Sequence, residues 1–241
     1  TRLKVIPRDQ HCISRKNISD SALKVMSRLR SKGHQAYLVG GAVRDLLLGG
    51  HPTDFDIATD ATPETIHALF RNSRIIGRRF RIVHVRFGRE IIEVTTFRGH
   101  HDNGMEQSTP GDGGNHSRQS ASGLLLRDNV YGTLEEDAVR RDLTVNALYY
   151  DSGNFEVFDH VHGLQDLKRR SVCIIGDPAV RFREDPVRML RVLRFAAKLD
   201  FNIDQATARA IPGCAHLLSE IPAARLFDEF LKLFLSGHAA S

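Results

Sequence analysis

Apolar and polar residues repeat with two different periods along the chain, and each period predicts a different kind of element. In the range 19–32, apolar residues recur every three or four positions, which is the spacing of one face of an amphipathic helix. Ser19 stands at its start as a helix cap, and Gly33 follows it as a stop signal. In the range 81–87, apolar side chains alternate along one face, which predicts a half-buried strand.

The same reasoning extends to other elements of the first 176 residues. Thr62 followed by Pro63 predicts the start of a helix, because proline is tolerated in the first turn. Thr133 and Glu136 form a capping-box pattern, which predicts a helix running into the mid-140s. The small polar residues at 151–154 favour a hairpin turn between two strands. Further strands are predicted at 36–39, 54–58, 74–76, 91–97 and 171–176, and a short helix at 43–48.

The chain changes character near residue 176. From Asp185, with Pro186 in the first turn, the pattern is helical to the end, with Pro212 and Pro222 as interruptions. Strands followed by helices predict an α+β fold, in which an all-helical neck follows a sheet-based head. A polar loop rich in Gly and Ser, at about 102–123, is expected to be mobile. The predicted division is 1–150 for the head, 151–176 for its end and 177–241 for the neck.

Composition narrows the class of protein. The chain has 241 residues, of which 41% are hydrophobic, and no run of about 18 apolar residues, so we expect no membrane span. Its start lacks the pattern of a secretion signal, which predicts a cytoplasmic protein. Cys12, Cys173 and Cys214 lack paired spacing and are expected to be reduced thiols. The net charge of +5 fits a polyanionic partner such as nucleic acid.

Two acidic residues stand in the predicted strand at 54–58. Asp54 and Asp56 are two positions apart, so in a strand both carboxylates face the same way, and they repel each other unless a cation lies between them. Carboxylate oxygens favour Mg²⁺ or Mn²⁺. Gly40 and Gly41 precede them, between a predicted strand and a helix, where backbone N–H groups can approach a phosphate. This combination predicts a site for a nucleotide and a metal ion.

At this point the chain resembles a known family. The ranges 38–45 (LVGGAVRD) and 54–57 (DFDI) resemble the first signature of the nucleotidyltransferase superfamily, within the class of bacterial poly(A) polymerases and CCA-adding enzymes. The range 140–147 (RRDLTVNA) resembles the second motif of that class, and 184–195 (EDPVRMLRVLRF) resembles its nucleobase-selecting helix. The resemblance implies a nucleotidyltransferase head with a mixed β-sheet and flanking helices.

The resemblance also implies roles for particular residues. Asp54 and Asp56 would hold two Mg²⁺ ions, and Glu93 on a neighbouring strand would be the third metal-binding carboxylate. Asp142 would be either a catalytic carboxylate or a contact to the ribose, and Asn146 is expected on the same helix face. The residues implied to bind ATP are Gly40, Gly41, Arg44, Arg141, Asp142, Asn146, Glu184, Asp185, Arg188, Arg191 and Arg194.

The nucleobase-selecting helix has a predicted orientation. Arginines recur at every third position from Arg188 to Arg194 and form a basic stripe on one side. Leu190, Leu193 and Ala197 lie roughly opposite and are expected in the core. Glu184, Asp185 and Arg188 are implied to read the base of the incoming nucleotide by hydrogen bonds to its Watson–Crick edge.

One segment separates the two subfamilies. The range 75–85 (IIGRRFRIVHV) resembles the poly(A) polymerase pattern, whereas CCA-adding enzymes have a Gly-rich stretch there. Arg78 and Arg79 in this range are expected to contact RNA or the triphosphate. The resemblance therefore implies the transfer of AMP from ATP to RNA 3′ ends. The alternatives are CCA addition to tRNA and a non-catalytic RNA-binding head. A phosphohydrolase is disfavoured, since no His–Asp cluster is recognisable.

Overall fold

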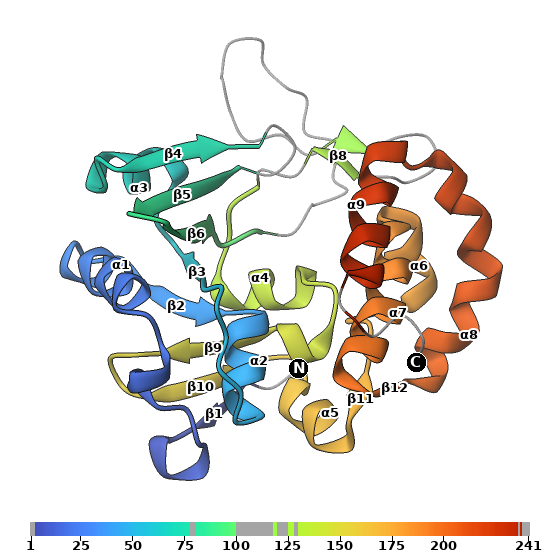
Figure 1. Cartoon of the computed structure of the whole chain (residues 1–241), viewed down its shortest axis with the longest axis horizontal. Helices are drawn as coiled ribbons and strands as arrows, with labels where there is room; N and C mark the ends of the chain where they lie inside the picture. Colours follow the sequence, from blue (N-terminus) through green and yellow to red (C-terminus); the bar gives the residue numbers. More distant parts are fainter. Residues whose placement is uncertain are drawn as a thin grey trace.

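The computed structural model describes residues 3–77, 81–99, 118–119, 125–127, 130–235 and 237. Most of the predicted polar loop at 102–123, together with Arg78 and Arg79, lies outside these residues. An eight-stranded sheet forms one part of the molecule, and the last four α-helices gather on one side of it (Figure 1). The strands of this sheet are β1 (Lys4–Ile6), β2 (Ala36–Val39), β3 (Asp56–Thr59), β4 (Ser73–Ile76), β5 (Ile82–Phe87), β6 (Glu90–Thr96), β9 (Leu148–Asp151) and β10 (Glu156–Asp159).

The helices and the small strands complete the described architecture. The α-helices are α1 (Asp20–Ser31), α2 (Gly41–Leu47), α3 (Pro63–Leu69), α4 (Leu134–Arg140), α5 (Gly163–Arg169), α6 (Pro178–Glu184), α7 (Val187–Leu199), α8 (Gln205–Cys214) and α9 (Ala223–Phe234). The 3₁₀ helices are η1 (Arg8–Gln10), η2 (Arg15–Asn17), η3 (Thr144–Asn146) and η4 (Ala215–Glu220). Two short ladders join β7 (Arg118–Gln119) to β8 (Leu125–Arg127) and β11 (Ser171–Val172) to β12 (Asn202–Ile203).

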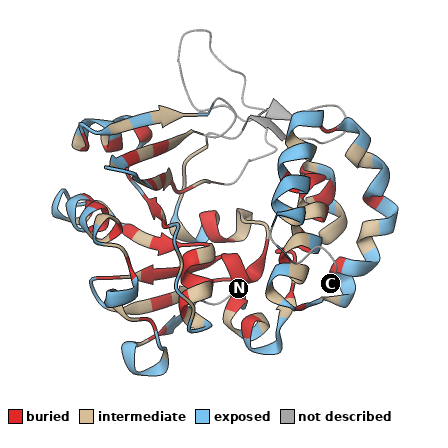
Figure 2. Cartoon of the chain, viewed as in Figure 1, coloured by how far each residue is buried: buried red, intermediate tan, exposed pale blue. Residues whose placement is uncertain are grey.

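The large sheet is mixed, as predicted. Its strand order is β1-β10-β9-β2-β3-β6-β5-β4. β3 and β6 run parallel, whereas the other neighbouring strands of the sheet are antiparallel. Buried residues concentrate along these strands and on α2, while the outer sides of α8 and α9 are largely exposed (Figure 2). The expected α+β fold, a mixed sheet with flanking helices followed by helices, is confirmed.

Several local signals act as predicted. The Ser19 hydroxyl accepts a hydrogen bond from the Ala22 N–H at the start of α1. Thr62 caps α3 in the same way. Thr133 and Glu136 form both hydrogen bonds of the capping box at the start of α4. Each of these signals depends on residues within one helical turn, so each can be recognised from neighbouring positions alone.

The predicted strand at 54–58 starts two residues later than expected. Asp56 pairs with Val39, the last residue of β2. The next residue, Gly40, has a φ of 78° and turns the backbone into α2. Because β2 ends there, its ladder with β3 cannot extend to Asp54, which precedes β3 in an exposed segment.

The predicted helix from Thr133 into the mid-140s ends at Arg140. The following segment pairs with residues about thirty positions further along: Leu143 forms a β-bridge with Ile174, and the Ile175 N–H donates to the Asp142 carbonyl. This pairing replaces the helical hydrogen bonds. The prediction that Asp142 and Asn146 share one helix face is therefore wrong, because Asn146 lies in η3 and Asp142 lies in the bend between α4 and the Leu143 bridge.

Three further expectations need correction. The strand predicted at 171–176 is limited to Ser171–Val172, since the next residues pair with the 142–144 segment. Helical structure begins at Pro178 and not at Asp185, because the Asp177 carboxylate caps α6. Leu193, expected in the core, is 43% exposed. The buried face of α7 is instead formed by Val187, Met189, Val192 and Phe195.

Two composition-based expectations can be compared with the structure. Across the described ranges, none of the helices combines the length and apolar character needed to cross a bilayer. Cys12, Cys173 and Cys214 are free thiols.

Candidate active site

A cavity of about 450 Å³ opens where the sheet meets α2 and α7. Its walls come from three regions that are far apart in the sequence: residues 40–56, in two neighbouring stretches, residues 141–146 and residues 191–198. The predicted site residues among its lining are Gly40, Gly41, Arg44, Asp54, Asp56, Arg141, Asp142, Asn146, Arg191 and Arg194. The fold therefore gathers carboxylate, amide and guanidinium groups around one space.

The first wall is the turn from β2 into α2. Gly40 has the positive φ that glycine adopts without strain, and a Cβ at this position would lie 3.4 Å from Asp56 Oδ2. A Cβ on Gly41 would lie 3.4 Å from the Nη2 atom of Arg44. Because 3.4 Å is an ordinary van der Waals distance, space does not require glycine at either position, whereas the positive φ of Gly40 does favour it there.

Arg44 is fixed beneath this turn. Its side chain is 2% exposed, and its Nε and Nη2 atoms both lie 2.7 Å from Asp45 Oδ1. Its Nη1 atom donates to Asn146 Oδ1 at 2.7 Å. A buried guanidinium is stable only when its donors are satisfied, and these contacts satisfy most of them. Arg44 thereby links α2 to η3.

The second wall carries the acidic residues. Asp56 at the start of β3 is in register with Glu93 on the parallel strand β6. Burial raises the pKa of Asp56 to about 6; the negative charge of Glu93 and, less strongly, that of Asp54 add to this rise, whereas Arg141 opposes it. Glu93 itself does not line the cavity, and its Oε1 lies 3.3 Å from Nε2 of His84.

These carboxylates fit a divalent cation in one specific way. Within the ranges that the structure describes, no group of three or more His, Cys, Asp or Glu side chains is arranged to hold a metal ion by itself. Mg²⁺ usually takes one or two protein carboxylates and completes its shell with water and substrate phosphates. Asp54 and Asp56 match this donor set, and a cation beside Asp56 would offset the charges that raise its pKa.

The third wall is the segment after α4. Asp142 Oδ2 lies 2.5 Å from Arg191 Nε, and Asp142 Oδ1 accepts from the Leu143 N–H at 2.8 Å. Burial would raise the pKa of Asp142, but the charge and hydrogen bond of Arg191, together with the Leu143 N–H, outweigh it and lower the pKa to about 2. Asp142 is therefore a firmly ionised carboxylate that joins this segment to α7.

Arg141 has its own buried partners. Its Nε and Nη2 atoms contact Asp137 Oδ2 at 3.1 and 3.0 Å, and Nε also donates to the Tyr149 hydroxyl at 2.8 Å. The Tyr149 hydroxyl donates in turn to Asp137 at 2.6 Å. This network holds Arg141 at the cavity wall beside Asp56, whose charge it partly offsets.

The residues implied to read the base lie next to the cavity but do not line it. Arg188 Nη1 donates to Glu184 Oε2 at 2.7 Å and to the Arg181 carbonyl at 2.9 Å. Asp185 accepts two hydrogen bonds from Arg225 of α9, at 2.8 and 2.6 Å. The side chains of Glu184 and Arg188 therefore bond to each other, and that of Asp185 bonds to α9.

Sequence reasoning missed several residues of the cavity. His51 and Thr53 line it from the segment before Asp54, and Phe195 and Lys198 line it from α7. Lys198 could have been found, because it lies one turn after Arg194 on the same helix face. Phe195 carries no polar signal, so only its packing identifies it.

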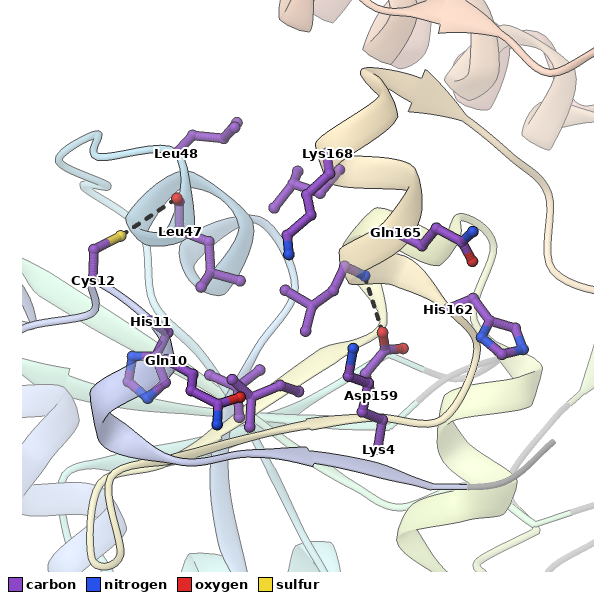
Figure 3. A pocket seen from close by; sticks show the side chains of 14 residues that line it. Lys4, Gln10, His11, Cys12, Leu47, Leu48, Asp159, His162, Gln165 and Lys168 are labelled. Carbon is purple, nitrogen blue, oxygen red and sulfur yellow. Dashed lines mark hydrogen bonds between the residues drawn. The ribbon is translucent and has the colours of Figure 1, made fainter.

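A second, larger cavity of about 540 Å³ lies at the other end of α2, between the N-terminal segment and α5 (Figure 3). Leu47, Leu48, Lys4 and Lys168 are among its lining, and none of the predicted site residues is. Its one acidic lining residue, Asp159, accepts hydrogen bonds from the backbone at the start of α5. The two cavities therefore differ in chemistry more than in size.

Comparison with solved structures places the fold among enzymes that bind nucleotides. The crystal structure of the Bacillus stearothermophilus CCA-adding enzyme in complex with CTP superposes with a TM-score of 0.73. The two sequences are 35% identical, and the match covers 88% of this chain and 47% of that chain.

Family comparison gives the assignment. The family described as "Poly A polymerase head domain" matches residues 36–173, which is more than half of the chain. The chain belongs to the poly A polymerase head domain family. Residues 200–241 match a second family, described as "Probable RNA and SrmB- binding site of polymerase A".

Curated relatives include both subfamilies. Poly(A) polymerase I of Escherichia coli O6:H1 is 56% identical over 237 residues, which cover 98% of this chain and 50% of the relative. The CCA-adding enzyme of Bacillus pumilus is 40% identical over 212 residues, which cover 88% of this chain and 49% of the relative. The chain spans about half the length of the curated relatives that it matches.

Proposed function

We propose that this chain is the catalytic part of a polynucleotide adenylyltransferase that needs no template and transfers AMP from ATP to RNA 3′ ends, releasing pyrophosphate. One observation carries the proposal: residues of the family's head, at 40–56 and 141–146, and residues of α7 beyond it, at 191–198, bring carboxylates and arginines around a single cavity. Higher identity to a poly(A) polymerase I than to a CCA-adding enzyme, 56% against 40%, supports ATP as the substrate.

The residues proposed to hold the divalent cations, Mg²⁺ or Mn²⁺, are Asp54 and Asp56, which line the cavity. Glu93, in register with Asp56 on β6, is proposed as the third carboxylate, a role that requires its side chain to turn from His84 toward the cavity. When bound, such ions lower the pKa of the attacking 3′-hydroxyl and neutralise the phosphates of the leaving group. Asp142 is held too firmly by Arg191 to accept a proton near neutral pH, since its pKa is about 2. We therefore favour an orienting role for Asp142 near the ribose, together with Asn146.

The cationic wall is proposed to bind the triphosphate. Arg44, Arg191 and Arg194 line the cavity in fixed positions, and Gly40 and Gly41 let backbone N–H groups approach a phosphate. Positioning and charge stabilisation of this kind provide most of the catalysis in phosphoryl-group transfer. Arg141 is proposed to contribute charge from the opposite side. Glu184, Asp185 and Arg188 are proposed to read the base, and Arg78 and Arg79 to contact RNA.

The test is primer extension with this chain, Mg²⁺, a labelled RNA oligonucleotide and each nucleoside triphosphate supplied separately. We expect extension with ATP, and its loss in Asp54→Asn and Asp56→Asn. The matched control is Asp60→Asn, because Asp60 is an exposed aspartate close in sequence that does not line the cavity.

Other outcomes would replace the proposal. Strong use of CTP on a tRNA that lacks its 3′ end, with growth stopping after a few nucleotides, would establish the CCA-adding alternative. Another outcome is that the chain binds RNA and incorporates no nucleotide while circular dichroism shows that its fold is intact. This outcome would favour the non-catalytic RNA-binding head. Extension by Asp56→Asn at the wild-type rate would exclude the proposed catalytic site.

A further inference from the structure

The aromatic ring of Phe195 lies among three arginines of the cavity. The guanidinium carbon atoms of Arg194, Arg44 and Arg191 are 4.4, 5.2 and 5.5 Å from the ring centroid. Phe195 is 8% exposed and lines the cavity from α7. These distances lie within the range in which the negative face of an aromatic ring attracts a cation.

Three like charges around one ring need compensation. Asp45 holds Arg44, and the buried carboxylate of Glu229 contacts Arg194 at 2.9 Å and Arg191 at 3.5 Å. Asp142 also holds Arg191, at 2.5 Å, and together these carboxylates fix the guanidinium groups and partly neutralise them. The ring attracts the same groups without carrying a net charge, so it holds them together while their positive potential remains available to an anion.

We propose that Phe195 is a positioning residue, which sets the spacing of Arg44, Arg191 and Arg194 so that together they bind the polyphosphate of the incoming nucleotide. The inference rests on the proposed function of the cavity and deepens it. The ring also couples two helices, since Arg44 belongs to α2 whereas the other two arginines and Phe195 belong to α7. Without the ring, each arginine keeps its carboxylate partner but loses its contact with the one aromatic ring that all three arginines share.

The competing explanation is that Phe195 only fills the core. Phe201 provides a matched control, because it is 7% exposed and belongs to the same hydrophobic cluster. One guanidinium, that of Arg170, lies 5.3 Å from its ring centroid, and Phe201 does not line the cavity. Loss of either ring creates a comparable packing defect, but loss of the Phe195 ring alone would disturb the arginines of the cavity.

The experiment measures binding of inorganic tripolyphosphate to the full 241-residue chain by titration calorimetry. The variants are Phe195→Leu, Phe195→Met, Phe195→Tyr and the control Phe201→Leu, each with its thermal midpoint measured. We expect both ringless variants at 195 to weaken binding about 10-fold, which corresponds to the loss of cation–π contacts worth about 1.4 kcal/mol in total. Phe195→Tyr, which keeps the ring, should restore most of the affinity, and Phe201→Leu should bind as the wild type does.

The ATP dependence of primer extension adds a second readout. The two ringless variants should raise KM for ATP with a smaller effect on kcat, because ground-state binding of the polyphosphate is what they disturb. Equal tripolyphosphate affinity in wild type and Phe195→Leu would overturn the inference, as would failure of Phe195→Tyr to restore binding. The proposed function has its own outcome: weaker tripolyphosphate binding in Phe195→Leu, in a chain that extends no RNA, would uphold the inference and reject the function.

Discussion

The two sides of the candidate active site are built on opposite electrostatic principles. On the β3 side, Asp56 lies beside Glu93 and Asp54, and burial, followed by the negative charges of these two residues, raises its pKa. On the α7 side, the cations come with anions already in place, as in the contact of Asp142 with Arg191. On the first side the carboxylates outweigh the cation Arg141, which opposes them, and on the second side carboxylates of the protein partly neutralise the arginines.

This difference in charge indicates which side of the cavity needs a bound ion to balance its charge. Like charges held together cost stability until a counter-ion binds, so the carboxylate side is suited to recruiting a cation. Paired arginines keep their geometry without a ligand and need no rearrangement when an anion arrives, which is the preorganisation that favours catalysis. Variants on the carboxylate side should therefore reduce activity more than stability, and variants that break ion pairs on the α7 side should reduce stability more.

Asp56→Asn should give the largest effect on activity and the most favourable effect on stability. Removing this carboxylate should reduce primer extension by about 10³-fold, because the cation loses a central ligand. Without divalent ions the free energy of unfolding should stay equal or increase, since repulsion by Glu93 and Asp54 disappears. Urea denaturation in a chelating buffer, beside the extension assay, measures both. A loss of stability in Asp56→Asn would contradict the prediction that the neighbouring carboxylates destabilise ionised Asp56.

Glu229→Gln should give the largest effect on stability, on the other side of the cavity. The Glu229 side chain is 7% exposed and accepts a hydrogen bond from Arg194 Nε. Breaking a buried ion pair costs about 3 kcal/mol, because the remaining cation is left without its partner. The free energy of unfolding should fall accordingly. Asp228→Asn is the control, since Asp228 is the exposed neighbour on α9, and an equal loss in both variants would argue against the pairing.

Asp142→Asn should show a smaller loss that depends on pH. The folded pKa of about 2 lies below the ordinary value of 3.8, so ionised Asp142 stabilises the fold above pH 3.8, and this contribution is lost as the pH falls toward 2. The shift corresponds to about 2 kcal/mol at pH 7. The stability difference between wild type and variant should therefore be full at pH 7, shrink as the pH falls below 3.8 and close only near pH 2 and below. A gap of constant size across this range would mean that the ion pair with Arg191 contributes nothing.

Local elements could be predicted from the sequence wherever their signals lie within a few residues. The capping box of Thr133 and Glu136 is one case, and the alternating strand β5 is another. The sequence could not predict that α4 ends at Arg140, because Asp142 and Leu143 pair with residues near Ile174. A competing partner about thirty positions away has no signature in the local pattern.

The cavity shows the same division. The motif residues pointed to both of its sides, because carboxylates and arginines carry their chemistry in their identity. The orientation of α7 was predicted in part: Arg191 and Arg194 of the predicted basic stripe line the cavity, but Leu193, which was expected in the core, is exposed. The partner Glu229 becomes evident only when α9 packs against α7, and the contact of Phe195 with Arg44 only when α2 and α7 meet at the cavity. The roles of the site residues stay predictions for the experiments above.

Lys198→Ala should give the smallest effect and separates binding from folding on the cationic side. Lys198 lines the cavity, and in the described part of the chain it forms no ion pair of the kind that holds Arg191 and Arg194. An exposed lysine contributes little to stability, so the thermal midpoint should not change. Its charge is free to meet a phosphate, and its loss should raise KM for ATP about 3- to 5-fold with little change in kcat. Lys168→Ala is the matched control, because Lys168 is an exposed lysine that lines the second cavity, and its KM should equal that of the wild type. If both variants raise KM equally, the effect comes from the overall charge of the chain, and the result would not support binding of the polyphosphate in the candidate active site.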